Sequence, residues 1–296
     1  MHIFLIRHGE TEHNVAGLFA GVTDSRLTVH GVQQTKSLGK YLTTHRNLRF
    51  TRVYASDLQR AYMTAEEIQR HQASHWTEER APDVVRLELL REQDFGSYEL
   101  VPWASRRAQQ APDPQDPSFR PQETAESMAL RADMFVTDHI VPLSASLATN
   151  EQDIQPECVA VVSHGLFLSA LWRTLVTKFH AGTVTLGPNV EVLGYGRPLE
   201  YLPSWSNTAF LEMTFHPSSV YPNARTAGEE PAAPTQSTLL PFAGVSLVVH
   251  AINGRDHLVD LKRARGGIGS SPYDAKQKSL DGFFKRPKGG AGAAAS

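Results

Sequence analysis

The 296-residue chain lacks most features that mark secreted, membrane-spanning or metal-binding proteins. Its single cysteine, Cys158, excludes an intrachain disulfide framework and fits a reducing compartment, and we expect it to be buried. No apolar stretch approaches the roughly 18 residues of a membrane span, and no secretory leader is recognisable, so we expect no membrane partner. No Cys/His spacing is typical of zinc and no glycine-rich nucleotide loop occurs, so we expect neither a metal nor a cofactor.

Charge is distributed unevenly along the chain. Its formal net charge is −2, but residues 262–296 hold eight Lys or Arg and two Asp, so that residues 1–261 carry −8 and the end carries +6. Glycines and alanines dominate the last residues, a composition typical of disorder. We therefore predict one folded domain over 1–261 and a basic, disordered tail over 262–296.

Short apolar runs alternate with stretches of helical periodicity along the acidic part. Strands are predicted at 2–6, 51–55 and 159–163, before Leu89, and at 209–215 and 245–252. Helices are predicted at 31–43, 58–70, 124–140 and 166–178. This alternation predicts a three-layer α/β/α fold with a mostly parallel sheet, and we expect the two late strands to pair antiparallel at its edge.

Two predicted strands end in the same dipeptide. His8-Gly9 follows the strand at 2–6, and His164-Gly165 follows the strand at 159–163. Ligands bind beyond the carboxyl ends of strands in open α/β sheets. Arg7 precedes His8; arginine grips phosphate oxygens with its planar fork, and histidine can act as a covalent nucleophile. A lone histidine there is more often structural, but two such ends indicate a phosphoryl site.

Two further charged residues stand near predicted strand ends. Arg60 lies in the first turn of the helix after the strand at 51–55, and its structural alternative is a surface residue of an amphipathic helix. Glu92 follows an apolar run and precedes the Phe95-Gly96 turn. Both positions are compatible with the site formed by the two histidines.

Together these segments resemble the histidine phosphatase superfamily, which includes the cofactor-dependent phosphoglycerate mutases. The resemblance covers much of residues 1–215 in the family's order. The similar segments are 7–14, 23–28 with Gly31 and Gln34, 56–65, 91–96, 126–127 with Arg131, 163–165 and 206–209. The chain departs from the family at Ala20, where many relatives carry a polar residue, and at 98–100, which lacks the glycine that usually follows the Phe95-Gly96 turn. Both departures leave the substrate open.

The resemblance implies a phosphoglycerate mutase-like fold and a role for each matching residue. His8 would carry the phosphoryl group, and Glu92 would be the general acid for the leaving oxygen and then the base for water. The phosphate would be surrounded by Arg7, Asn14, Arg60, His164 and Gly165. Nearby guanidiniums would keep His8 neutral. The implied activity is metal-independent hydrolysis of a phosphorylated small molecule or phosphoprotein; a mutase-type phosphotransferase is the alternative.

Three proline- or glycine-rich segments interrupt the pattern. Residues 102–121 and 217–241 contain five prolines each. In the family, an insertion such as 102–121 would cover the active site; a passive surface loop is the alternative. We expect 217–241 to be a flexible linker and 186–203 to form part of the pocket rim.

The tail contains a second motif. Leu280, Phe283 and Phe284 share one face of a tight helical turn, and adjacent exposed phenylalanines are unusual unless a partner buries them. With Gln277 they resemble the peptide box that binds the replication sliding clamp, proliferating cell nuclear antigen (PCNA). The resemblance implies that the apolar side chains fill a clamp pocket while flanking cations face an acidic surface. The alternative is that both phenylalanines fold back onto the domain.

The basic run 285–288 is similar to a short nuclear import signal, so we expect a nuclear or cytoplasmic location or both; a solvated patch is the alternative. Direct nucleic-acid binding is not expected. Three functions remain open: a phosphatase directed to a nuclear partner, a clamp-binding adaptor on a catalytically retired phosphatase fold, and a metabolic sugar-phosphate phosphatase with an incidental tail. Retention of the five catalytic candidates, Arg7, His8, Arg60, Glu92 and His164, favours an active enzyme.

Overall fold

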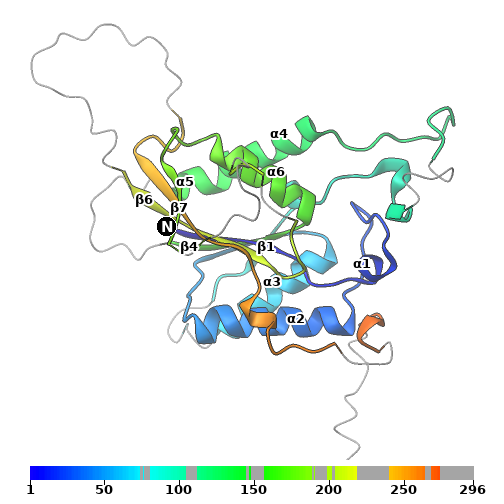
Figure 1. Ribbon diagram of the computed structural model, residues 1–296, viewed down its shortest axis with the longest axis horizontal. Coiled ribbons are helices and arrows are strands. Elements are labelled where there is room, and N and C mark those ends of the chain that lie inside the picture. Colours follow the sequence, from blue (N-terminus) through cyan, green and yellow to red (C-terminus); the bar gives the residue numbers. More distant parts are fainter. Residues whose placement is uncertain are drawn as a thin grey trace, which may run out of the picture.

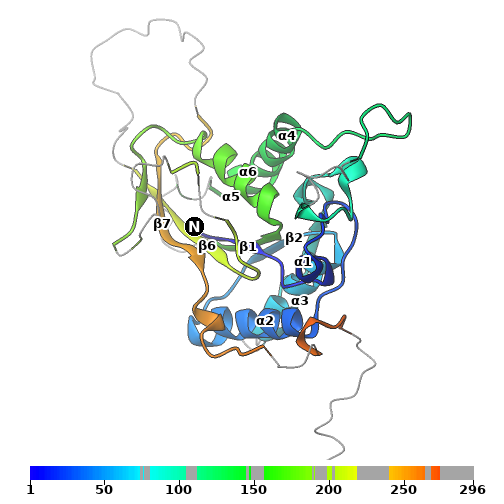
Figure 2. The same ribbon diagram turned by 45° about the vertical axis from the view of Figure 1, so that its right-hand side comes forward.

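The computed structural model describes residues 1–73, 76, 81–104, 112–144, 147, 157–188, 190, 199–201, 204–218, 240–263 and 268–273. They form a seven-stranded sheet between two layers of helices (Figures 1 and 2). Its strands are β1 (His2–Arg7), β2 (Arg52–Ser56), β3 (Val84–Leu87), β4 (Cys158–Ser163), β5 (Val184–Leu186), β6 (Phe210–Pro217) and β7 (Val245–Gly254).

The order of the strands is β3-β2-β4-β1-β6-β7-β5. β1, β2, β3 and β4 pair in parallel, as do β5 and β7, whereas β6 runs antiparallel to both β1 and β7. This confirms the predicted fold class and the antiparallel pairing of the late strands. Their predicted place at the sheet edge is wrong, because β5 lies outside β7. Only three residues long, β5 is too short to show alternation in the sequence.

Helices cover both faces of the sheet. Below it in Figure 1 lie α2 (Val29–Lys40) and α3 (Gln59–Gln72). Above it lie α4 (Ala125–Phe135), α5 (Val141–Ser144) and α6 (Gly165–Val176), while the short α1 (Glu12–Ala16) follows β1. The predicted helix 124–140 is thus α4 continued by a π-helical turn at Val136–Ile140, and α2 continues likewise over Tyr41–His45.

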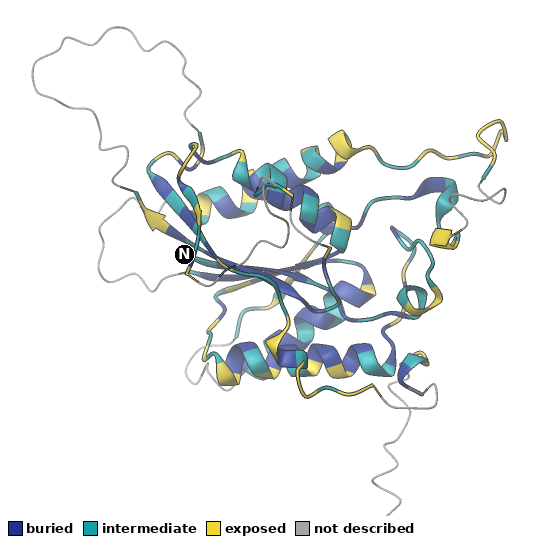
Figure 3. Cartoon of the chain, in the orientation of Figure 1, coloured by how far each residue is buried: buried dark blue, intermediate teal, exposed yellow. Residues whose placement is uncertain are grey.

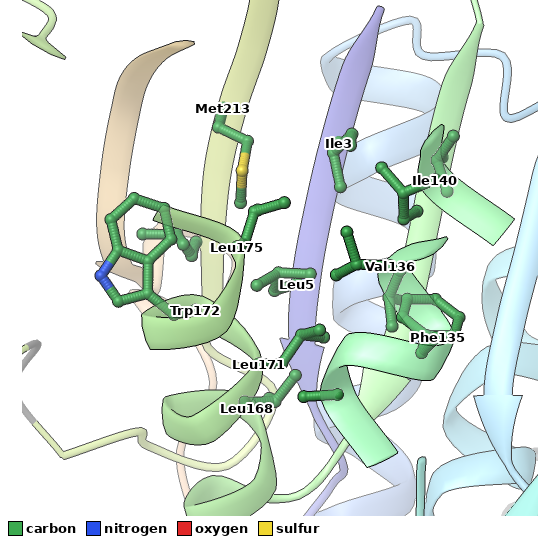
Figure 4. Packing of buried hydrophobic residues seen from close by; sticks show 14 of the residues in the cluster. Ile3, Leu5, Phe135, Val136, Ile140, Leu168, Leu171, Trp172, Leu175 and Met213 are labelled. Atoms are coloured by element: carbon green, nitrogen blue, oxygen red, sulfur yellow. The ribbon is translucent and has the colours of Figure 1, made fainter. Parts of the chain in front are cut away.

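The alternation of β1 divides the core between the two layers. Ile3 and Leu5 pack against α4 and α6, whereas Phe4 and Ile6 pack against α2 and α3 (Figure 4 shows the first cluster). The central strands β1, β2, β4 and β6 are largely buried, whereas the edge strands β3 and β5 are more exposed. Exposed residues also lie on the outer faces of the helices (Figure 3). Cys158 is buried, as expected, and burial raises the pKa of its thiol to about 12. None of the helices among the described residues is long and apolar enough to span a bilayer.

After β7 the chain forms a strap, which we define as residues 255–263 and 268–273, across α2 (orange in Figure 1). Ser37 Oγ donates to the carbonyl of His257 at 2.5 Å. At the far end of the strap, the Tyr273 N–H donates to the carbonyl of Leu27 at 2.9 Å. Arg263 forms an ion pair with Glu10, two residues after His8. Residues 262–263 and 268–273 of the expected tail therefore lie against the domain.

Several predictions concern segments that the structure describes only in part or not at all. The peptide box 277–284 and the basic run 285–288 lie outside the described residues. So do most of the expected linker 217–241, residues 105–111 of the first proline-rich segment, and most of the expected rim 186–203.

Candidate active site

The two His-Gly strand ends lie side by side. β1 and β4 are neighbours in register, with Arg7 opposite Ser163, so the residues that follow each strand meet at the same sheet edge. The ring centroids of His8 and His164 are 5.1 Å apart. The sequence therefore predicts correctly which two loops meet here.

The His8 ring has a fixed orientation and is held in its neutral form. His8 Nδ1 lies 2.7 Å from the carbonyl oxygen of Gly9, so Nδ1 carries the proton and the lone pair is on Nε2. Burial lowers the pKa of His8 well below 6.5, and the charges of Arg60 and Arg7 lower it further. The imidazole is consequently neutral at neutral pH, which is the protonation state that a nucleophile requires.

The main chain at His8 is held by residues that directly precede β6. Its carbonyl accepts hydrogen bonds from the Thr208 N–H at 3.1 Å and from Asn207 Nδ2 at 3.2 Å. Asn207 also donates to Asn14 Oδ1 at 3.1 Å, so one amide links the backbone of His8 to α1. Asn207 falls in the recognised segment 206–209, but the sequence did not single it out as a site residue.

Arg60 organises the site and is almost completely buried, with 1% of its surface exposed. Its Nε donates to His164 Nδ1 at 3.2 Å, which places the His164 proton on Nε2. That Nε2 is buried and has no partner among the described residues. Burial, followed by the charge of Arg60, lowers the pKa of His164 well below 6.5. Burial also lowers the pKa of Arg60 to about 10, which leaves the guanidinium cationic at neutral pH.

The loop 20–23 lies between Arg60 and a carboxylate that the sequence did not identify. Arg60 donates to the carbonyls of Ala20, Gly21 and Thr23 at 2.6–3.2 Å. Glu99 accepts the N–H groups of Gly21, Val22 and Thr23 at 3.1–3.2 Å. Opposite charges thus fix opposite sides of the loop, and Arg60 keeps little hydrogen-bonding capacity beyond it.

Arg7 and Asn14 both line the cavity beside His8. Arg7 Nη1 donates to the carbonyl of Trp205 at 2.6 Å, whereas its Nε is buried without a partner among the described residues. Asn14 Oδ1 accepts the Thr11 N–H at 3.2 Å in the capping box of α1. Burial lowers the pKa of Arg7, and the charge of Glu92 opposes that shift.

Glu92 is fixed at the start of α6. Its Oε1 accepts the N–H groups of Phe167 at 2.9 Å and Gln93 at 3.0 Å, and its Oε2 accepts the Leu166 N–H at 3.1 Å. The N-terminal end of a helix favours a carboxylate. Because Oε2 accepts one such bond and Oε1 accepts two, Oε2 keeps the larger unused accepting capacity.

These residues surround one cavity of about 280 Å³. Six of the predicted site residues line it: Arg7, His8, Asn14, Arg60, Glu92 and Gly165. His164 contacts Arg60 and His8 but is not part of the lining. Trp205 and Ser169 also line the cavity, with Trp205 Nε1 donating to Ser169 Oγ at 3.0 Å, and the sequence did not identify either one. Among the described residues, no cluster of His, Cys, Asp or Glu is arranged to hold a metal ion.

His257 of the strap supports the backbone beside His8. Thr208 has a φ of +57°, which is unusual for a β-branched residue. His257 Nε2 lies 2.9 Å from Thr208 Oγ1, whose own proton goes to the Asn207 carbonyl, so His257 is the donor. This bond stabilises the backbone that holds the carbonyl of His8.

His257 should make the protein sensitive to acid. Burial lowers its pKa from 6.5 to about 4 in the folded protein. Since the unfolded chain binds the proton more readily between these values, the free energy of unfolding falls as pH decreases from 6.5 to 4. His257→Gln should reduce the loss measured by urea unfolding between pH 7 and 4 by about 2–3 kcal/mol. Equal losses in both proteins would contradict this assignment, because His8 and His164 titrate in each.

Comparisons with known proteins agree with this geometry. A family model described as the histidine phosphatase superfamily (branch 1) matches residues 3–187. A Schizosaccharomyces pombe protein named as a probable phosphatase is 30% identical over 285 residues, covering 95% of this chain and 79% of that protein. The metal-independent phosphoserine phosphatase of Arabidopsis thaliana is 28% identical over 211 residues, covering 71% of this chain and 82% of that protein.

A solved structure shows the same fold. The mycobacterial glucosyl-3-phosphoglycerate phosphatase in complex with VO3 aligns with a TM-score of 0.53 and 21% identity, covering 73% of this chain and 91% of that one. The family match extends over more than half of the chain and includes both strand ends that carry His8 and His164. On this evidence, the protein belongs to the histidine phosphatase superfamily.

Proposed function

We propose that the protein is a metal-independent phosphomonoester hydrolase that works through a phosphohistidine on His8. The observation that carries this proposal is the buried, neutral His8, whose Nε2 is unprotonated in a cavity also lined by Arg7, Arg60 and Glu92. The Arabidopsis relative, named as a metal-independent phosphoserine phosphatase, supports the same chemistry. No observation on this chain favours phosphoryl transfer to a second organic hydroxyl, so we propose hydrolysis rather than mutase activity.

Two displacements complete the reaction. His8 Nε2 bonds to phosphorus as the bond to the ester oxygen breaks, and Glu92 gives its proton to that leaving oxygen. Water then attacks phosphorus, Glu92 takes one proton from it, and the bond to His8 breaks, releasing phosphate. The positive charges of Arg7 and Arg60 stabilise the negative charge on the equatorial oxygens of the phosphoryl group.

Trapping of the phosphoenzyme tests the proposal. Full-length protein is mixed with a ³²P-labelled phosphomonoester in excess EDTA, quenched with denaturant and analysed for protein-bound label. We expect label that survives alkali and is lost in acid, as a phosphoramidate is, and phosphate release that EDTA leaves unchanged. Hydrolysis abolished by EDTA, or label on a hydroxyl residue, would overturn the proposal.

We also propose that the sliding clamp PCNA is bound by Gln277, Leu280, Phe283 and Phe284. The enzyme would be nuclear, cytoplasmic or both, with the basic run 285–288 as its import signal. Support comes from the fit of these four residues to the clamp-binding box and from the surrounding positive charge. Saturable binding of a fluorescent 272–290 peptide, lost on replacing both phenylalanines by alanine, is expected. The proposal fails if the peptide does not bind and the same double substitution changes nothing in the full-length protein.

The assays of phosphate release and clamp binding also distinguish an active phosphatase from a clamp-binding adaptor. Clamp binding by a full-length protein that releases phosphate from no ester would favour a retired phosphatase fold. Retention of Arg7, His8, Arg60 and Glu92 around one cavity argues for the active enzyme.

A further inference from the structure

The buried and the exposed lining residues of the active-site cavity differ in polarity. Its buried lining includes His8 and Arg60, which are 4% and 1% exposed. Its exposed lining includes Trp103 and Leu166, which are 49% and 46% exposed. The phosphoryl-binding end is therefore polar and cationic, whereas the end open to solvent presents large apolar side chains. Exposed apolar surface at the mouth of a cavity is typical of a ligand-binding site.

An aromatic wall forms one side of this mouth. The rings of Phe19 and Phe95 are 4.8 Å apart, and those of Phe19 and Trp103 meet edge to face at 6.5 Å. All three residues line the cavity. Aromatic groups that pack in these geometries offer a further ring a favourable edge or face.

The backbone holds the wall in place. The Phe19 N–H donates to the carbonyl of Val101 at 3.0 Å, and the Trp103 N–H donates to the carbonyl of Gly17 at 2.8 Å. Between these bonds, Leu100 adopts a φ of +63° and donates its N–H to the carbonyl of Phe19 at 2.7 Å. The chain therefore tolerates a left-handed leucine, which costs about 1–2 kcal/mol, in the turn that presents Trp103.

Charge at the described mouth disfavours an anionic leaving group. Among the described residues that line the cavity, the arginines are Arg7 and Arg60 and the sole carboxylate is Glu92. Both arginines lie at the phosphoryl end, and Arg60 is already bonded to the loop 20–23. Among the described lining residues, a carboxylate or second phosphate beyond the ester oxygen would therefore meet apolar side chains instead of a cation.

We infer that the preferred substrates are phosphomonoesters whose leaving alcohol carries an uncharged aromatic or branched aliphatic group, seated against Phe19, Phe95, Trp103 and Leu166. This inference rests on the proposed phosphatase activity. The size of the cavity agrees with it: a cavity of about 150 Å³ holds benzene, and this one, at about 280 Å³, leaves space for a phosphoryl group beside a ring.

Matched esters test the substrate class. The value of kcat/KM is measured for 2-phenylethyl phosphate, ethyl phosphate and 3-phosphoglycerate, with wild type and with Trp103→Ala, Trp103→Phe and Leu130→Ala. The first two alcohols have similar acidity, so their ratio reports binding of the ring. We expect 2-phenylethyl phosphate to exceed ethyl phosphate by at least about tenfold, from the apolar area that the ring buries, and 3-phosphoglycerate to be the poorest.

The variants show whether the preference for 2-phenylethyl phosphate depends on Trp103. Trp103→Ala should bring the ratio of 2-phenylethyl to ethyl phosphate toward one, and Trp103→Phe should keep most of it. Leu130, which is 63% exposed on α4 and outside the cavity, is the control, and Leu130→Ala should keep the wild-type ratio. A wild-type ratio near one, preference for 3-phosphoglycerate, or an unchanged ratio in Trp103→Ala would overturn the inference while leaving the phosphatase intact. Absence of phosphate release from every ester would instead overturn the proposed function.

Discussion

Replacing His8 by alanine should lower phosphate release from every monoester by at least about 10³-fold, as expected when a covalent nucleophile is removed. Among the described residues, the imidazole beside His8 is that of His164, and it cannot replace His8 without rearrangement because its Nδ1 accepts a bond from Arg60. The measurement is steady-state phosphate release in EDTA. The same variant should also fail to form the labelled phosphoenzyme.

His45→Ala is a matched control, since His45 is exposed in the π-helical turn after α2. It should retain wild-type rates. Circular dichroism and the urea midpoint show whether His8→Ala remains folded; removal of a buried ring is expected to leave the sheet intact. Full activity in a folded His8→Ala protein would disprove the phosphohistidine mechanism.

Replacing Glu92 by glutamine should slow hydrolysis of alkyl phosphates by about 10²–10⁴-fold, the range typical of a lost general acid. The effect on 4-nitrophenyl phosphate should be much smaller, because its leaving group departs without a proton. Glutamine keeps the shape of the side chain and one acceptor for the start of α6. It turns an amide nitrogen toward the Leu166 N–H, however, so we also expect a stability loss of about 1 kcal/mol.

The ratio between the two substrates separates acid catalysis from misfolding, which would lower both rates alike. Glu88→Gln is the control, because the side chain of Glu88 is 77% exposed four residues before Glu92. That variant should leave both substrates unaffected. An equal loss on alkyl and nitrophenyl esters would show that Glu92 does not protonate the leaving oxygen.

The sequence predicts the part of the site that local order determines. His8 and His164 directly follow buried strands, and parallel strands bring their carboxyl ends to one sheet edge, so their proximity follows from strand pairing alone. Arg60 is correctly placed near them, but the sequence does not show that most of its donors go to loop carbonyls rather than to open space.

Residues that act through distant contacts escape sequence reasoning. Glu99 bonds to Gly21 across 78 positions and His257 bonds to Thr208 across 49, and neither distance leaves a periodic signal. The same holds for Trp205, which contributes a backbone carbonyl to Arg7. The sequence shows that 98–100 lacks the usual glycine, but only the backbone angles show that Leu100 takes the left-handed conformation there, beside Trp103.

The strap limits how far any tail-bound partner can stand from the enzyme. Tyr273 is bonded to Leu27, and only four peptide units separate it from Gln277, a span of at most about 14 Å when fully extended. A protein held by 277–284 would therefore lie close to the start of α2 and to the ion pair between Arg263 and Glu10. So short a connection would hold the enzyme next to its partner. Phosphorylated groups on that partner would then be present at the active site at millimolar effective concentration.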